Sequence, residues 1–225
     1  MIGTITAGGG NPIAPAYTAL GTFQVLGAAI SFTIPNVSIA KNETLLVALY
    51  SNFGVGDITV TIDLNGNVLQ EDQDGGYGIT NALEMFHWKA TSAIVNGTLT
   101  FTFGVGPLNF CVILAKFTAL AGVWLNGANT GEPPPTTDAN PDTGLVALMP
   151  TMPQIHWGLV GTNGVTGDTF GTPRNAMVAS QSVYGVGFSL GLKEMYRVPK
   201  PAIQARGGVT GQTARQTAAS VVVYA

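Results

Sequence analysis

Residues 43–67 read ETLLVALYSNFGVGDITVTIDLNGN. Within this stretch, residues 44–51 form a continuous apolar run, which is typical of a strand that is buried on both faces. In residues 57–64, polar and apolar residues then alternate, so that the isoleucines, the valine and the leucine lie on one face of a strand and the threonines on the other. The Asn65-Gly66 pair that follows adopts positive φ at low cost and favours a hairpin turn. The stretch therefore predicts two strands, a glycine break and a hairpin.

Short strand patterns recur along the rest of the chain and are separated by turns rich in glycine and proline. They lie at residues 29–36, 83–90, 97–104, 109–120, 144–150, 154–161, 175–185, 186–198 and 219–225. No long segment has the periodicity of a helix, although residues 83–90 could form a short turn. Many short strands between such turns predict an all-β fold, namely an antiparallel β-sandwich of the jelly-roll type.

The chain divides around one proline-rich segment. Residues 127–144 read GANTGEPPPTTDANPDTG, and three successive prolines cannot donate to a β-ladder. We therefore expect an exposed loop over 127–144 within a single β-sandwich domain that spans residues 19–225. The alternative is two small sandwiches at 19–126 and 145–225.

The first forty residues carry no charged side chain, and residues 1–18 contain few large apolar ones. Three successive glycines make an independent fold of this part unfavourable. We expect residues 1–18 to form an extended N-terminal arm that is either disordered or laid along another subunit. The residues expected to bind that partner are Ile2, Ile5, Pro12, Ile13, Pro15 and Tyr17.

Charge is scarce and unevenly placed. Only 9% of the 225 residues are charged, against about 25% in a typical globular domain. The surface is therefore either coated with neutral polar residues or covered by other subunits. Residues 1–173 hold eleven acidic and three basic side chains, whereas residues 174–225 hold six basic ones and the single acid Glu194. Because the bases are scattered and the net charge is −3, nucleic-acid binding is not expected.

Neither a signal peptide nor a membrane-spanning segment is evident. The N-terminal MIGTITAGGG lacks the basic start and the continuous apolar core of a secretion signal. No uninterrupted apolar stretch approaches the length that crosses a bilayer. We therefore expect no contact with a membrane.

Several of these segments together resemble jelly-roll proteins of tailed-phage virions and bacterial surfaces. The similar segments are ISFTIPNVSIAKNETLLVALYSN, ITVTIDLNGNVLQ, MFHWKA, GTLTFTF and FCVILAKFTAL, followed by GLVALMP, IHWGLVG, KEMYRV and TARQTAASVVVYA. They cover most of the chain, but they are patterns of strand and turn rather than signatures of a site. Members of the family generally lack a catalytic site, so the resemblance implies a decoration, cement or fibre role in the virion and no functional residue. The long neutral arm and the proline loop depart from the pattern.

The residues that could carry chemistry do not form a known constellation. His87 and His156 are each followed by tryptophan and lie beside neither a cysteine nor a Gly-x-Ser-x-Gly elbow, so we expect structural roles. Cys111 lies in the apolar run NFCVILAKF and is expected to be a buried, unreactive thiol. We therefore predict no enzymatic activity and no cofactor.

One weak cation site is conceivable. Carboxylate and amide oxygens are the ligands that Ca²⁺ prefers, and they gather at Asp63, Asn65, Asp72 and Asp74. Residues 63–67 resemble the opening of a calcium loop, but Val68 stands where that loop requires glycine. We favour a solvated acidic hairpin end over a calcium site.

Two functions from different classes remain. The first is a virion structural protein, namely a capsid decoration or cement subunit on the capsid surface. Its expected partners are the major capsid protein and further copies of itself, in a homo-oligomer such as a trimer. The second is an extracellular or tail-fibre module that binds a carbohydrate or a receptor. Rings for sugar stacking would come from Trp88, Trp124, Trp157, Tyr50, Tyr77 and Tyr184.

Overall fold

The protein is an assembly of antiparallel β-strands. The structure is a computed structural model, and it describes residues 16–27, 30–52, 58–62, 67–74, 81–105, 109–118, 126–129, 142–146, 155–163, 170–173, 178–184, 190–197, 205–211 and 216–224. These residues form seventeen strands and no helix, and every strand pair is antiparallel. The predicted all-β, antiparallel fold is therefore confirmed for this part of the chain.

The strands before residue 119 form two sheets. The central sheet has the order β1-β9-β3-β7-β6, and the N-terminal outer sheet has the order β2-β8-β4-β5. The central strands are β1 (Tyr17–Leu26), β9 (Asn109–Thr118), β3 (Glu43–Asn52), β7 (Asn81–Lys89) and β6 (Gln70–Asp74). The outer strands are β2 (Ser31–Ile39), β8 (Ile94–Phe103), β4 (Ile58–Ile62) and β5 (Asn67–Val68).

The strands after residue 125 form two further sheets. The C-terminal outer sheet has the order β10-β17-β12-β15-β14, and a small sheet has the order β11-β16-β13. The first comprises β10 (Asn126–Asn129), β17 (Gln216–Tyr224), β12 (Ile155–Asn163), β15 (Leu190–Arg197) and β14 (Val178–Tyr184). The second comprises β11 (Asp142–Val146), β16 (Ala205–Gly211) and β13 (Phe170–Pro173).

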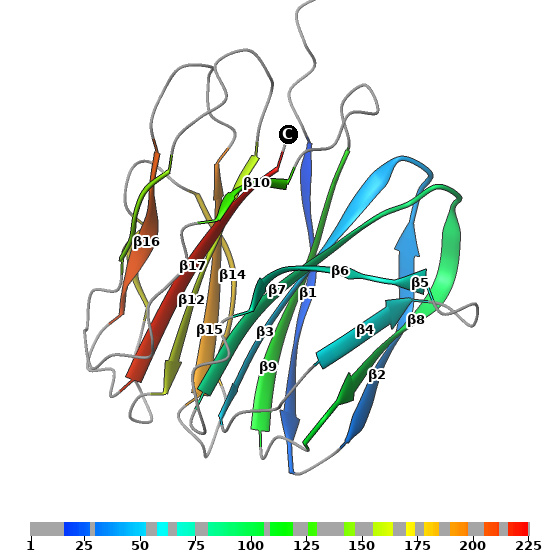
Figure 1. Ribbon diagram of the computed structural model, residues 1–225, viewed down its shortest axis with the longest axis horizontal. Helices are drawn as coiled ribbons and strands as arrows, with labels where there is room; N and C mark the ends of the chain where they lie inside the picture. The colour runs from blue at the N-terminus through cyan, green and yellow to red at the C-terminus, as the bar shows by residue number, and fades with distance from the viewer. Residues whose placement is uncertain are drawn as a thin grey trace, which may run out of the picture.

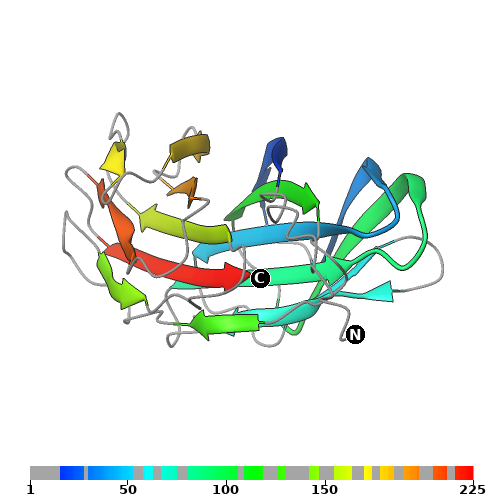
Figure 2. The ribbon, with the colours of Figure 1, turned by 90° about the horizontal axis from the view of Figure 1, so that it is seen from above.

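Three of these sheets are stacked in layers, with the central sheet in the middle. In Figure 1, the C-terminal outer sheet with β17 and β12 lies to the left, the central strands follow, and β2, β4 and β8 lie to the right. Seen from above in Figure 2, the red C-terminal strand and the N-terminal outer sheet lie toward opposite ends of the long axis. The C-terminal outer sheet covers the central sheet strand by strand: β14 contacts β1 and β9, β15 contacts β9 and β3, β12 contacts β3, and β17 contacts β7 and β6.

The central sheet is buried on both faces because its main strands are apolar at consecutive positions. In β3, Leu45, Val47 and Leu49 face the N-terminal outer sheet, and Leu46, Ala48 and Tyr50 face the C-terminal one. All six are fully buried. Successive side chains of a strand point to opposite faces, so a continuous apolar run serves two cores at once. The two-sided burial predicted for residues 44–51 is therefore confirmed.

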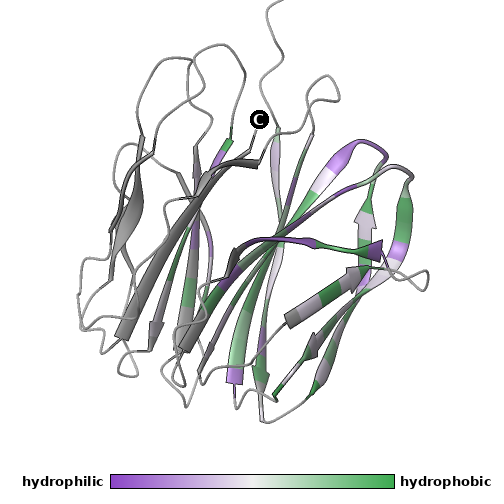
Figure 3. Cartoon of the chain, viewed as in Figure 1, coloured by the Kyte–Doolittle hydropathy of each residue, from purple (hydrophilic) through white to green (hydrophobic). Residues whose placement is uncertain are grey.

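The first core lies between the central and the N-terminal outer sheets. Alternating residues of the outer strands point into it, among them Ile34, Val60, Ile62, Leu99 and Phe101. Phe110 of β9 makes an edge-on contact with Phe32 and a tilted one with Phe103. The outward residues of β4, and those of β8 from residue 98 onward, are threonines. The outer strands are banded along their lengths in Figure 3, whereas β6 is hydrophilic.

The second core joins the two halves of the chain. Leu46, Tyr50, Met85, Cys111 and Ile113 of the central sheet pack there against Ile155, Trp157, Leu159 and Leu192 of the C-terminal outer sheet. Every one of these side chains is almost completely buried. Since burying a side chain of this size contributes about 1.5–3 kcal/mol, the core is a large share of what holds the halves together.

The bulges in the pairing of β2 with β8 fall at residues that tolerate a left-handed backbone, Asn36 in β2 and Asn96 in β8. Asn36 and Asn96 have φ of 64° and 53°, and the pairing of β2 with β8 shifts on both sides of Val37. Asparagine enters this region more readily than other non-glycine residues, which explains why both bulges form there. Pro35 also lies on this edge strand, where its missing donor costs no ladder bond.

Other sequence-based expectations fall at element boundaries. The hairpin predicted around Asn65-Gly66 appears as the antiparallel pairing of β4 with β5, and residues 63–66 lie outside the described part. Residues 83–90, for which a turn was considered, belong to β7 and the residue after it. Strands β10 and β11 enter the two ends of the predicted loop 127–144, and residues 130–141 lie outside the described part.

Candidate functional site

A buried carboxylate is the most unusual polar group of the described structure. Glu194 lies on β15, paired with Leu159 of β12, and it is completely buried. It lies on the same strand face as Leu192 and Tyr196, which point into the second core. A strand inside a sandwich directs every second residue inward, so this acid is held at the joint between the central and the C-terminal outer sheets.

Three neutral donors surround this carboxylate. The hydroxyl of Tyr17 and the indole Nε1 of Trp157 both donate to Glu194 Oε1. The amide Nε2 of Gln181 donates to Glu194 Oε2 at 2.9 Å. Because a buried carboxylate is costly unless it is hydrogen-bonded, these donors are what makes the position tolerable. We call Tyr17, Trp157, Gln181 and Glu194 the carboxylate cluster.

The electrostatics of the cluster favour a proton on Glu194. Burial raises the pKa of Glu194 above its ordinary value of 4.5, and the hydrogen bonds from Tyr17, Gln181 and Trp157 oppose this rise in part. Desolvation disfavours the charged form, and hydrogen bonds to the carboxylate favour it. The net effect is a carboxyl group that gains its proton more readily in the folded protein than in the unfolded chain.

The cluster ties β1 to the C-terminal half. The ring of Tyr17 stacks on that of Tyr196, with centroids 3.9 Å apart and planes 13° from parallel. Gln181 of β14 also donates to the carbonyl of Leu114 at 2.8 Å. Leu114 is paired with Gly21 next to the register shift in β1 between Ala19 and Gly21. Gln181 thus bridges a main-chain carbonyl beside a bulge to the buried acid.

The second pair of titratable groups is His87 with Asp72. His87 Nδ1 lies 2.7 Å from each carboxylate oxygen of Asp72, and the side chain of Asp72 is completely buried. His87 lies on β7 and Asp72 on the neighbouring edge strand β6. The pair fastens this edge of the central sheet, and His156 is likewise buried, within β12. Both histidines therefore lie inside the fold.

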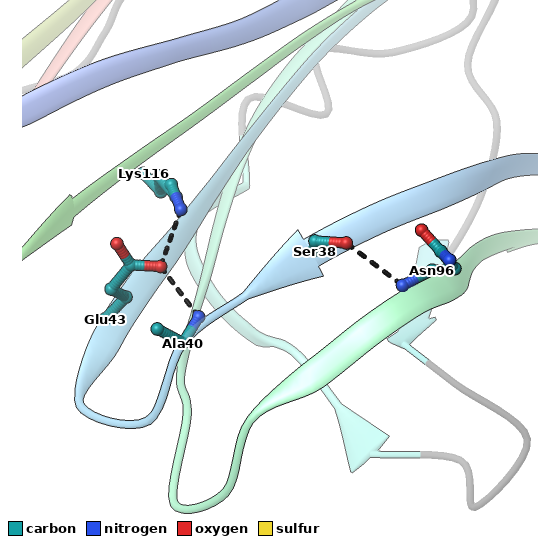
Figure 4. A network of polar contacts seen from close by, with 5 residues as sticks. All are labelled: Ser38, Ala40, Glu43, Asn96 and Lys116. Atoms are coloured by element: carbon teal, nitrogen blue, oxygen red, sulfur yellow. Dashed lines mark hydrogen bonds and ion pairs between the residues drawn. The ribbon is translucent and has the colours of Figure 1, made fainter.

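The corner between β2 and β3 carries an exposed polar network (Figure 4). Glu43 Oε2 accepts from the main-chain N–H of Ala40 at 2.7 Å and from Lys116 Nζ at 2.7 Å. In the same view, the main-chain N–H of Asn96 donates to Ser38 Oγ at 3.0 Å. These contacts fix the turn into β3 and the bulged part of β2. They are local structural bonds, because each joins neighbouring strands or a turn.

The calcium candidates do not come together in the described residues. Asp72 is engaged by His87, and Asp74 ends β6. Asp63 and Asn65 lie outside the described part of the chain. Where the structure describes the chain, no group of three or more histidine, cysteine, aspartate or glutamate side chains could hold a metal ion.

The residues expected to contact a partner lie mostly beyond the described chain. Ile2, Ile5, Pro12, Ile13 and Pro15 fall within residues 1–15, which the structure does not describe. Tyr17 is the second described residue and begins β1. Its hydroxyl belongs to the carboxylate cluster.

Three of the six aromatic rings considered for sugar stacking pack in the cores. Trp157 and Tyr50 are completely buried, and Trp88 packs against the first core. Trp124 and Tyr77 lie outside the described residues. Cys111 is a buried thiol, and burial raises its pKa to about 12, as expected for an unreactive structural cysteine.

Sequence reasoning did not single out Glu194, Gln181 or Tyr196 as members of a site. One signal was present, since Glu194 is the single acid after residue 173 and shares its strand face with Leu192 and Tyr196. The donors come from β1, β12 and β14, and no sequence pattern brings those strands together. No family model, no curated protein and no solved structure matches the chain. Within the described residues no helix is long and apolar enough to span a membrane.

Proposed function

We propose that the protein is a non-enzymatic structural subunit of a virion, which decorates or cements a capsid by bridging neighbouring subunits. The observation that carries this proposal is the absence of charged residues from the edge strands β1, β2 and β14. Soluble proteins commonly place charges on such edges to prevent association. Neutral edges are inexpensive to desolvate, which suits a contact with a neighbouring subunit.

We further propose a jelly-roll arrangement for residues 17–118, which would suit the same role. The chain crosses repeatedly between the sheets: β1, β3, β6, β7 and β9 belong to the central sheet, and β2, β4, β5 and β8 to the outer one. The orders β1-β9-β3-β7 and β2-β8-β4-β5 agree with two interlocked Greek keys of four strands each. Jelly rolls are a common architecture of viral capsid proteins. This likeness concerns the fold alone. It supports a virion role but identifies no functional site.

The titratable groups of the described part favour a structural role over a catalytic one. Glu194 is fully enclosed, and Asp72 and His87 engage each other inside the fold. A catalytic acid or base has to reach a substrate, whereas these groups fasten strands to one another. The sugar-binding alternative draws no support from Trp88, Trp157 or Tyr50, because these rings pack in the cores.

The arm is proposed as the element that reaches the shell. Tyr17 anchors the start of β1 through the carboxylate cluster, and the arm is proposed to extend from this point. An uncharged segment can add to a neighbour's sheet through its main chain. The partner is proposed to be the major capsid protein, with further copies of this chain beside it on the capsid surface.

The experiment that tests this role compares the full chain with a variant that lacks residues 1–15. Both are added to particles of the virus that encodes the protein, and the bound amount is measured by sedimentation and mass spectrometry. The full chain should occupy the particles, and the truncated chain should bind at least several-fold less. If both proteins bound to the particles in equal amounts, the proposed role of the arm would be wrong. If neither bound, the proposed virion role would be wrong.

A further inference from the structure

The neutral edge of the central sheet offers an uninterrupted site for strand pairing. Residues Gly21–Leu26 of β1 pair with β9 without a shift in register, from Gly21 opposite Leu114 to Leu26 opposite Asn109. Strand β1 is the first strand of the central sheet, and among the described strands only β9 pairs with it. Its outer main-chain groups therefore form a row of donors and acceptors that a further strand can use.

The other neutral edges are interrupted. In β2, the register shifts on both sides of Val37, and Pro35 removes a main-chain donor. In β14, the register shifts between Ala179 and Ser182. Bulges disrupt a ladder and twist an edge away from a new partner. The stretch Gly21–Leu26 is thus the longest regular neutral edge among these three strands.

This edge is held rigidly and has two distinct faces. Phe23 and Val25 pack against the first core, whereas Thr22 is exposed and Gln24 is half-buried on the opposite face. A strand that is already ordered loses little entropy when it pairs. On the opposite edge of the sheet, β6 carries Glu71, Asp72 and Asp74, charges of the kind that prevent such pairing.

We propose that Gly21–Leu26 pairs antiparallel with the same segment of a second copy, around a two-fold axis. The two five-stranded central sheets then form one continuous sheet. A neutral segment pairs with itself readily in this way, because no like charges face each other across the two-fold axis. Registers that place Phe23 opposite Phe23, or Gln24 opposite Gln24, keep Phe23 and Val25 of both copies on one face.

A second copy is favoured over a different partner by the chemistry of the edge. The stretch offers neither charge nor an exposed aromatic ring, which are what usually select a particular foreign protein. It offers main-chain bonds and matched faces, which an identical strand supplies. The inference rests on the same neutral edges as the proposed assembly role, but it concerns the free protein and needs no particle.

The test is the mass of the full chain in solution, measured by light scattering after size exclusion over a range of concentrations. The native chain should be a dimer. The double variant Thr22→Lys/Gln24→Lys places positive charges on the paired edges and should be a monomer with unchanged circular dichroism. A matched control, Thr91→Lys/Thr102→Lys, adds the same charge at exposed positions away from β1 and should remain a dimer.

A cross-linking experiment keeps the test independent of any loss of folding. The variant Thr22→Cys should form a covalent dimer rapidly with a short thiol-reactive linker, and Thr102→Cys should not. The native Cys111 is buried and stays unmodified. The proposal would be overturned if the native chain were a monomer or a trimer. It would also be overturned if the double lysine variant stayed a dimer and Thr22→Cys did not cross-link. Loss of particle binding with the dimer retained would count against the proposed function alone.

Discussion

The stability of the joint between the two halves depends on pH through one buried carboxyl group, that of Glu194. The pKa of Glu194 is higher in the folded protein than its ordinary value of 4.5, because burial penalises the charge. The folded state then binds more protons than the unfolded state between these two values, so stability falls as pH rises. The contribution is fully present below about pH 4.5 and is lost as pH rises through the folded pKa.

The variant Glu194→Gln tests this dependence. Its side chain does not titrate, so the fall in unfolding free energy between pH 4.5 and the folded pKa should disappear from the pH profile. Urea unfolding of both proteins at a series of pH values measures the difference. Parallel profiles for the two proteins would show that Glu194 has an ordinary pKa in the fold.

Gly161 is required by the ring that lies on it. A Cβ at this position would stand 2.2 Å from Cδ2 of Tyr50 and 2.5 Å from its Cγ, and Tyr50 is completely buried. Gly161→Ala should therefore lower the unfolding free energy by about 1–3 kcal/mol, the usual cost of an overfilled core.

The companion variant Tyr50→Leu removes the clash. In the double variant, the alanine should cost at least 0.5 kcal/mol less than it does alone, the lower end of coupling between residues in contact. Denaturant unfolding of the four proteins gives this coupling. Strict additivity would place the ring of Tyr50 away from Gly161.

At the scale of elements, β1 depends on its first residue. Deleting residues 1–15 should leave the thermal midpoint almost unchanged, because the carboxylate cluster stays whole. Deleting residues 1–18 should lower the unfolding free energy by about 2–4 kcal/mol, since it removes a buried hydrogen bond and a stacked ring. Tyr17→Phe keeps the ring and should lose only about 1–3 kcal/mol. Equal stability of both truncations would show that Tyr17 does not anchor β1.

The strands could be predicted from the sequence far better than their partners. Alternation in residues 58–62 and the apolar run at 44–51 identify one strand with one buried face and another with two, because side-chain direction has a period of two residues. The sites could not be predicted in this way. Glu194 meets Tyr17 across 177 positions of the chain, and only the stacking of β14 and β15 on β1 and β9 brings them together.

At the scale of the molecule, the central sheet is a shared wall between two cores. If the C-terminal outer sheet were removed, the face of the central sheet that packs against it would expose Leu46, Tyr50, Met85 and Ile113. An exposed apolar face of this kind leads to association. We therefore expect the two halves to unfold together, in a single cooperative transition, rather than as the two independent sandwiches that the proline loop would allow.

Cys111 provides the most direct measurement of that claim, because the single thiol of the chain points into the second core. Its reaction with a chromogenic thiol reagent is followed across a denaturant series, next to the circular dichroism of the strands. The reaction should begin only where the strands unfold, with the same midpoint. Labelling of Cys111 at denaturant concentrations that leave the strands intact would show that the C-terminal outer sheet separates first, and would contradict a shared central sheet.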